Sequence, residues 1–248
     1  MAVQIHDYES IVLRTLRYGE SDVIGHLFTR EDGRRNVIAK GARKAKSRLG
    51  VRLEPFVMAR VQIRQGRGDL GLVQSVSLTA AHDQIRSSWQ LQQIAAAGLD
   101  MLARLSVEGV PNEAAFHLTT RFLSVLDSCD TDTEAGHAVL AGFQFKLLHT
   151  VGLAPQLGVC TRCARQEQLS AWSAADGGVV CSTCATVHDR AVEPMVHTQA
   201  VRATREPLTV LAQSSPDRAQ LAMARRLFVV GMCAEHAGFR PKELASGS

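Results

Sequence analysis

The chain has 248 residues, of which 46% are hydrophobic and 21% are charged, an ordinary composition for a globular protein with one large or two to three small domains. No apolar run approaches the roughly 18–20 residues that span a bilayer, and residues 1–14 lack the apolar segment of a signal peptide, so we expect a cytoplasmic protein. The net charge of +4 is concentrated between residues 30 and 67, which hold twelve Lys or Arg against three Asp or Glu and so favour a localised site for a polyanion.

The first 80 residues have the pattern of β-strands. Short β-prone runs at residues 11–13, 23–28, 36–39, 56–63 and 70–78 are separated by glycine-containing turn signals at 18–22, 31–33 and 66–68. Five short strands suit the five-stranded oligonucleotide-binding (OB) barrel, although a small sandwich would look much the same. We therefore expect a nucleic-acid-binding barrel domain over residues 1–80.

Helical periodicity replaces the strand pattern after residue 80. Apolar residues recur at helical spacing through residues 81–158 and again through 217–236. These segments predict the antiparallel helices of a bundle, with a cysteine-containing insertion at 159–188. The expected fold class is α+β, with an OB barrel over 1–80 and a helical domain over 81–248.

Two cysteine pairs predict one structural zinc ion. Cys160 and Cys163 are followed, after seventeen residues, by Cys181 and Cys184. A CxxC turn supplies two adjacent corners of a tetrahedron, and a hairpin of this length brings two such turns together. Four thiolates fill the coordination sphere, so the site is structural, and His188 is left out of the set. A redox CxxC is the rival interpretation, but it does not explain two motifs.

A cluster of positive charge follows the third predicted strand. The cations are Lys40, Arg43, Lys44, Lys46 and Arg48, and Arg34 and Arg35 precede the predicted strand. Most charge runs are solvated surface loops. The flanking Gly41 and Gly50 would let a ligand approach the backbone, and the preceding arginines would widen the basic face, so we predict a nucleic-acid site.

Aromatic residues are sparse in the predicted barrel. The first 80 residues contain only Tyr8, Tyr18, Phe28 and Phe56, and the two phenylalanines fit the inward phase of their strands. DNA binding is therefore expected to depend on phosphates more than on base stacking. A protein that holds the backbone leaves base edges free for pairing with another strand.

The sequence contains no catalytic constellation. The nine histidines are scattered, with no HExxH motif, no phosphate-binding GxxxxGK[ST] loop and no strand–GxGxxG–helix unit. Metal-dependent cleavage would need clustered carboxylates, which are few around the basic loop. We therefore expect no enzymatic activity.

Two cysteines lie outside the paired motifs. We expect Cys129 and Cys233 to be buried free thiols.

Several stretches resemble the RecO family of bacterial recombination mediators. The resembling segments are 18–22, 39–44 with 47–48, 53–56, 145–155 leading into Cys160, and 177–181. The resemblance implies an OB barrel and a helical bundle with an inserted zinc ribbon. It also implies binding of single- and double-stranded DNA, annealing, and loading of recombinase onto DNA coated with single-stranded-DNA-binding protein (SSB) in double-strand-break and gap repair, at the nucleoid.

The resemblance also implies protein partners, namely RecR and the acidic C-terminal tail of SSB. Candidate residues for the tail are Arg121, Arg225 and Arg226, each beside the apolar face of a predicted helix. Arginines in such positions more often lie over the edge of a core. An alternative function is an interaction adaptor, in which the zinc ribbon recruits other proteins and the basic loop binds RNA or an acidic tail without annealing.

Overall fold

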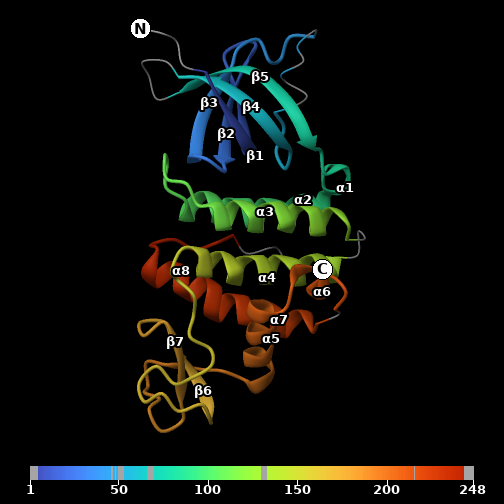
Figure 1. Ribbon diagram of the computed structural model, residues 1–248. Coiled ribbons are helices and arrows are strands. Elements are labelled where there is room, and N and C mark those ends of the chain that lie inside the picture. Colours follow the sequence, from blue (N-terminus) through green and yellow to red (C-terminus); the bar gives the residue numbers. More distant parts are fainter. Residues whose placement is uncertain are drawn as a thin grey trace. The chain divides into compact units, whose positions relative to one another are not determined.

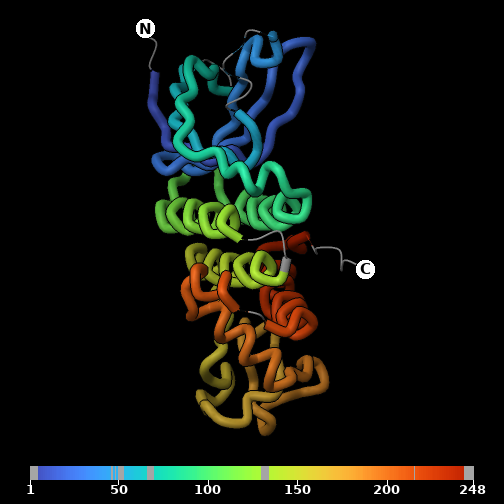
Figure 2. Tube along the Cα trace, turned by 90° about the vertical axis from the view of Figure 1, so that its right-hand side faces the viewer, coloured from blue at the N-terminus to red at the C-terminus, as the bar shows by residue number. Residues whose placement is uncertain are grey.

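The computed structural model describes residues 5–45, 47, 49, 53–65, 70–129, 133–214 and 216–242. The chain forms two compact units, residues 1–127 and 128–248. Figures 1 and 2 show the elements of each unit from two directions at right angles.

The first unit begins with a closed barrel of five strands. They are β1 (Ile5–Tyr18), β2 (Asp22–Thr29), β3 (Gly33–Ala39), β4 (Met58–Arg64) and β5 (Gly71–Ala80). The strand order around the barrel is β1-β2-β3-β5-β4, and β4 pairs with β1 to close it. All pairs are antiparallel except β3 with β5, where Val37 and Ile38 face Gly71 and Leu72. This closed five-stranded arrangement confirms the OB-type barrel and rules out the sandwich.

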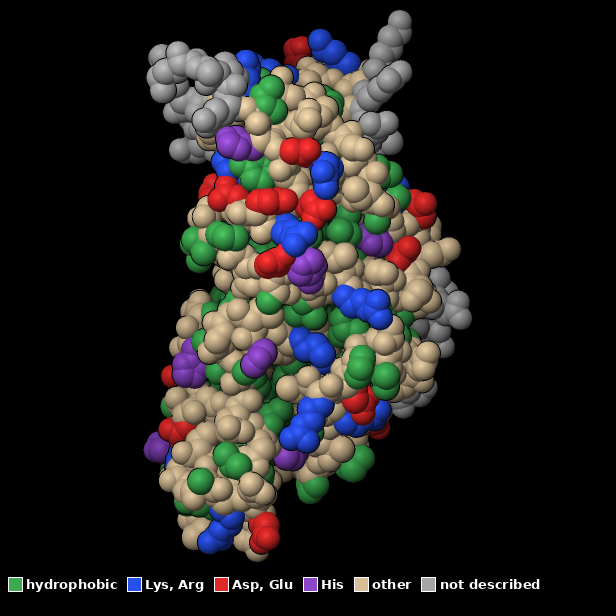
Figure 3. All heavy atoms as spheres, viewed as in Figure 1, with side chains coloured by type: hydrophobic (Ala, Val, Ile, Leu, Met, Phe, Trp, Pro, Cys, Tyr) green, Lys and Arg blue, Asp and Glu red, His purple; other side chains and the backbone are tan. Residues whose placement is uncertain are grey.

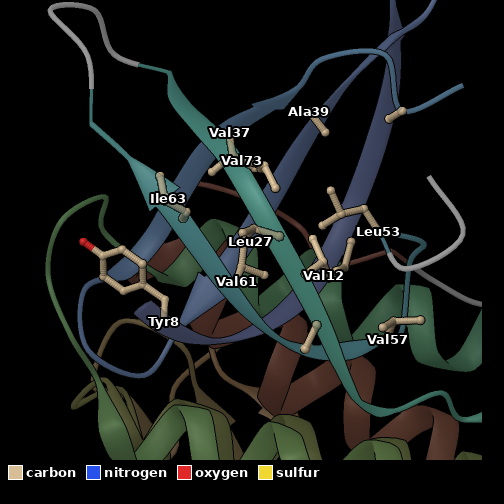
Figure 4. Close-up of a cluster of buried hydrophobic side chains, with 13 residues drawn as sticks. Tyr8, Val12, Leu27, Val37, Ala39, Leu53, Val57, Val61, Ile63 and Val73 are labelled. Atoms are coloured by element: carbon tan, nitrogen blue, oxygen red, sulfur yellow. The ribbon is translucent and has the colours of Figure 1, made fainter. Parts of the chain in front are cut away.

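Apolar side chains from all five strands fill the barrel. The strand pattern alternates, so that Ala59, Val61 and Ile63 of β4 are buried while the residues between them are exposed. Figure 4 shows Val12, Leu27, Val37, Val61, Ile63 and Val73 meeting in this interior, with Leu53 and Val57 from the segment before β4. The predicted strands are thus confirmed, and β1 is much longer than its predicted three-residue run.

Three helices complete the first unit: α1 (Asp83–Ser87), α2 (Trp89–Leu105) and α3 (Glu113–Asp127). Phe28 of β2 packs against Phe116 of α3, with ring centroids 6.2 Å apart. The α2–α3 connection also pairs with β3, where a Cβ on Gly33 would lie 2.0 Å from the carbonyl oxygen of Val110. Glycine is therefore required there, both for this approach and for its φ of +62°.

The second unit is built around α4 (Thr133–Thr150), whose described side chains are buried through most of its length. A three-stranded sheet follows, with β6 (Leu169–Ser173), β7 (Gly178–Cys181) and β8 (Arg190–Ala191) in the order β7-β6-β8. The remaining elements are α5 (Pro194–Arg205), α6 (Leu208–Leu211), α7 (Arg218–Ala224), the π-helix η2 (Arg225–Val230) and α8 (Gly231–His236).

The predicted boundary at residue 80 and the division into units at residue 127 differ by three helices. Helices α1 to α3 follow that boundary in sequence, yet they belong to the compact unit of the barrel through contacts such as Phe28–Phe116. The division into separable domains at 80 stays a prediction.

Candidate metal centre and nucleic-acid interface

The β6–β7 hairpin brings the two CxxC turns together. Cys181 is the last residue of β7, and the first turn is tied to the same strand by the N–H of Thr161, which donates to the carbonyl of Val179 at 3.0 Å. Within the first turn the N–H of Ala164 donates to the carbonyl of Cys160 at 2.9 Å. Ala164 has a φ of +60°, a left-handed conformation that lets the chain leave the turn abruptly.

The four cysteine sulfurs form one cluster. All lie within 4.8 Å of one another, and the sulfurs of Cys163 and Cys181 are 3.7 Å apart. Tetrahedral zinc with bonds of about 2.3 Å would place its sulfurs about 3.8 Å apart, so the donor set fits such an ion. Cys160 and Cys181 are buried, Cys184 is half-buried and Cys163 is exposed, while His188 is an exposed neighbour outside the cluster.

The electrostatics of the cluster also suit a bound cation. Backbone N–H groups, that of Cys181 foremost, lower the pKa of the Cys160 thiol to about 6. The adjacent sulfurs of Cys163 and Cys181 raise the pKa of Cys184 to about 12, because a second negative charge beside a thiolate is unfavourable. Four thiolates can therefore coexist here only with a compensating cation, which is what a metal supplies.

Arg162 links the two cysteine turns through ion pairs and a hydrogen bond. Its guanidinium lies 2.8 Å from the carboxylate of Asp176 and 2.7 Å from that of Asp189, and it donates to the carbonyl of Cys184 at 2.7 Å. Asp189 also accepts from the N–H of Thr186 at 2.7 Å, and its side chain is 3% exposed. Arg162 holds the pKa of Asp189 well below its usual range. Sequence reasoning missed this link, although an arginine inside a CxxC was a visible signal.

The cysteine ribbon rests on the helices of its own unit. The indole of Trp172 on β6 meets the ring of Phe228 on η2 edge to face, with centroids 4.9 Å apart. A Cβ on Gly231 would lie 3.1 Å from the indole nitrogen, so glycine leaves room for this contact. Nε2 of His236 donates to the carbonyl of Ala174 at 2.8 Å. The sheet is therefore anchored to η2 and α8.

The basic loop, whose described residues are 40–45 and 47, folds back onto the β1–β2 turn. The N–H of Gly41 donates to the carboxylate of Asp22 at 2.8 Å, and Gly41 has a φ of +65°. The N–H of Arg43 donates to the carbonyl of Ser21 at 2.8 Å, and its guanidinium donates to the carbonyl of Glu20 at 3.2 Å. Two of the segments that carry the family resemblance, 18–22 and 39–44, are thus in contact.

The structure brings together only part of the predicted basic set. Lys40, Arg43 and Lys44 are all exposed on the basic loop. Lys46 and Arg48 lie outside the described residues.

Arg34 and Arg35 lie at the opposite end of β3 from Lys40, about 20 Å away at strand spacing. Arg34 donates to the carbonyl of Ala103 at 2.8 Å. Arg35 pairs with Asp32 and lies over the ring of Tyr8, 5.3 Å from its centroid. Both arginines are therefore engaged within the barrel unit. On the face that Figure 3 shows, acidic and basic side chains lie interspersed over the first unit.

Comparison with known proteins places this geometry in a family. The profile described as "Recombination protein O N terminal" matches residues 1–82, and "Recombination protein O C terminal" matches residues 86–227. The chain belongs to the RecO family. The resemblance drawn from the sequence is thereby confirmed, and with it a role in DNA repair and recombination.

Curated relatives named "DNA repair protein RecO" support the assignment. The relative from Bacillus pumilus is 34% identical over 71% of this chain and 67% of its own length. The relative from Bifidobacterium longum is 30% identical over 85% of this chain and 87% of its own length. The relative from Myxococcus xanthus is 30% identical over 81% of this chain and 82% of its own length. RecO relatives therefore match both the barrel and the unit that carries the cysteines.

The arginines predicted to meet a partner tail in this RecO-family chain lie on two units. Arg121 is exposed on α3 of the first unit, and Arg226 is exposed on η2 of the second. Arg225, also on η2, donates from Nε to the side-chain oxygen of Gln144 at 2.7 Å, and Gln144 is fully buried on α4. The role of these three arginines in binding a partner stays a prediction.

Two further observations bear on the sequence predictions. Cys129 and Cys233 are both buried and lie outside the four-cysteine cluster, and burial raises the pKa of Cys233 to about 12. In the described part of this RecO-family chain, no helix has both the length and the apolar character needed to cross a membrane.

Proposed function

We propose that this RecO-family protein is a DNA-binding recombination mediator in double-strand-break and gap repair. It binds single- and double-stranded DNA, anneals complementary strands and helps to load recombinase onto SSB-coated DNA. The observation that carries the proposal is the basic loop, where Lys40, Arg43 and Lys44 are exposed and the backbone is fixed to the β1–β2 turn of an OB-type barrel. Exposed cations on a loop whose backbone is fixed to an OB-type barrel suit contact with the phosphates of a nucleic acid.

The mechanism rests on phosphate neutralisation. Two single strands repel each other through their phosphates, and cations that contact the backbone reduce this repulsion without covering base edges. The proposed DNA contacts are Lys40, Arg43, Lys44, Lys46 and Arg48. A strand that followed β3 to its other end would also meet Arg34 and Arg35. No bond is made or broken in this role, and we assign no catalytic residue.

We further propose that the four-cysteine cluster holds one Zn²⁺ ion with a structural role. Four sulfurs within 4.8 Å of one another supply a complete tetrahedral ligand set, which leaves no position for water or substrate, so the ion would supply cross-linking and charge compensation. Arg162 would assist by joining the two cysteine turns through Asp176, Asp189 and the carbonyl of Cys184.

The partners we propose are RecR and the C-terminal tail of SSB, in the cytoplasm at the nucleoid. A tail that is acidic and ends in an apolar residue needs a cation beside an apolar surface. Arg226 on η2 and Arg121 on α3 are exposed, which supports either as the cation that such a tail would contact. Arg225 is a third candidate on η2.

The experiment that tests DNA binding is a salt titration of affinity. Fluorescence anisotropy with labelled oligonucleotides compares the wild type with the Arg43→Ala/Lys44→Ala double variant. We expect weaker binding for every sequence and a salt slope lower by about two, one for each lost phosphate contact. Arg205→Ala/Arg240→Ala is the matched control, because it removes two exposed arginines of the second unit.

The control is expected to bind DNA as the wild type does. Unchanged affinity and slope in the loop variant would place the DNA site elsewhere. DNA binding without any annealing would instead favour the adaptor function.

A further inference from the structure

A hollow of about 530 Å³ lies beside the basic loop. Its walls come from the end of β1 at residues 15–17, from Val23 of β2, from the basic loop at 42–45 and 47, and from residues 53–54. The volume lies within the roughly 300–1,000 Å³ of pockets that take small ligands. The hollow is therefore large enough to accept part of a nucleotide from a strand lying across the loop.

The hollow is lined by two kinds of side chain. Leu16 is 49% exposed, and the buried Ala42 and Leu53 also line the hollow. Arg17, Arg43 and Lys44 add exposed cations to the same lining. An apolar wall beside cations is complementary to a nucleobase with its flanking phosphates.

The acidic group of the hollow is already neutralised. Glu54 lines the hollow, but its carboxylate forms an ion pair with Arg86. The nearby Asp22 is engaged as well, because it accepts from the N–H of Gly41 and from the hydroxyl of Ser21. The cations that line the hollow therefore give it a net attraction for phosphate.

Tyr18 supplies an exposed aromatic surface on β1, directly after the residues 15–17 that line the hollow. It is the last residue of β1, two residues after Leu16, and its side chain is 54% exposed. It pairs across the turn with Asp22, the residue that anchors the basic loop. Tyr8 and Phe28, by contrast, are buried, and Phe56 is half-buried. Tyr18 is thus an aromatic side chain of the barrel that a base can reach.

We propose that Leu16, Tyr18 and the hollow form a subsite for one unstacked base of a single DNA strand, while Arg17, Arg43 and Lys44 hold the phosphates on either side. This rests on the proposed function, since it places the subsite within the same DNA-binding surface. A base inside a duplex is paired and stacked, so it cannot enter. The subsite therefore favours single strands, whereas the phosphate contacts serve both forms. Since the subsite holds a single base, the edges of the neighbouring bases stay available for annealing.

The test compares single- and double-stranded oligonucleotides of the same sequence by anisotropy. Tyr18→Ala and Leu16→Ala should each weaken single-strand binding, roughly 5-fold to 100-fold for Tyr18→Ala because a stacked base is lost. Duplex affinity should stay within about twofold of the wild type, because no phosphate contact is removed. The salt slope should be unchanged for the same reason. Tyr18→Phe keeps the ring and should bind as the wild type does.

Leu78→Ala is the matched control, because Leu78 is 45% exposed on β5 and does not line the hollow. Circular dichroism and thermal melting confirm that each variant is folded. The subsite would be overturned if Tyr18→Ala and Leu16→Ala lost affinity equally for single strand and duplex. It would also be overturned if neither variant lost affinity for single strands. If those variants bind normally while Arg43→Ala/Lys44→Ala binds weakly, the subsite fails and the proposed function stands. If the loop variant also binds normally, both fail.

Discussion

Asp22 offers a test in which two physical effects predict opposite signs. It carries a negative charge beside the proposed DNA site, so on Coulombic grounds its removal should tighten DNA binding. It also accepts the N–H of Gly41 at 2.8 Å and so fixes the basic loop. If the position of the loop matters, Asp22→Ala should weaken binding although no cation has been removed.

The magnitudes decide between the two effects. A unit charge about 8 Å from a phosphate contributes about 0.5 kcal/mol in water, and salt screens this further. A hydrogen bond to a charged group contributes about 1.5–3 kcal/mol. Part of the loop order survives, because Arg43 still donates to the carbonyls of Ser21 and Glu20. We therefore expect a net loss of about 1 kcal/mol, roughly fivefold in affinity.

Asp22→Asn is the matched variant for this test. Its amide oxygen can still accept the N–H of Gly41, while the charge is gone. Anisotropy at a single salt concentration should give wild-type or slightly tighter binding for Asp22→Asn and weaker binding for Asp22→Ala. If Asp22→Ala binds DNA as tightly as Asp22→Asn or more tightly, the fixed loop does not contribute and our reasoning is wrong.

Three other predictions concern the second unit. Cys181→Ser should lose about one zinc per chain and lower the melting temperature, as measured by metal analysis and calorimetry; full metal content in the quadruple Cys→Ser variant would contradict the site. Lys146 donates to three carbonyls at the end of α5, at 2.7, 3.1 and 2.8 Å, so Lys146→Met should cost about 2–4 kcal/mol of unfolding free energy in urea titration, and a loss under 0.5 kcal/mol would refute this. Burial, with Arg218 and Arg225 nearby, lowers the pKa of His137 to about 4 from 6.5. As the pH is lowered from 6.5 to 4, the unfolded chain therefore takes up a proton that the folded chain does not. The free energy of unfolding falls by about 1–2 kcal/mol over this range, after allowance for the partial exposure of His137. The variant His137→Gln should lack this part of the decline, and an equal decline in both proteins would contradict the assignment.

Local patterns in the sequence sufficed where the determinant is local. Alternation in 57–64 predicts a strand with one buried face, and the structure has Ala59, Val61 and Ile63 inside the barrel. The spacing of Cys160, Cys163, Cys181 and Cys184 predicts that their sulfurs meet, because each CxxC and its hairpin are short-range structures, and they do meet.

Features that depend on contacts between distant segments could not be predicted. Arg34 and Arg35 looked like part of a basic face, but their partners Ala103 and Tyr8 become neighbours only when the barrel closes and α2 packs on it. The grouping of α3 with the barrel likewise depends on Phe28 meeting Phe116. Arg162 was visible in the first CxxC, but its acceptors Asp176 and Asp189 are identified only by the fold of the hairpin.

The most direct test of the central claim is the rate at which the protein anneals two complementary labelled strands, followed by energy transfer at fixed salt. We predict that the wild type accelerates annealing and that Arg43→Ala/Lys44→Ala largely abolishes the acceleration, whereas Arg205→Ala/Arg240→Ala retains it. A folded wild-type protein that binds both strands without accelerating their annealing, or a loop variant that anneals at the wild-type rate, would contradict it.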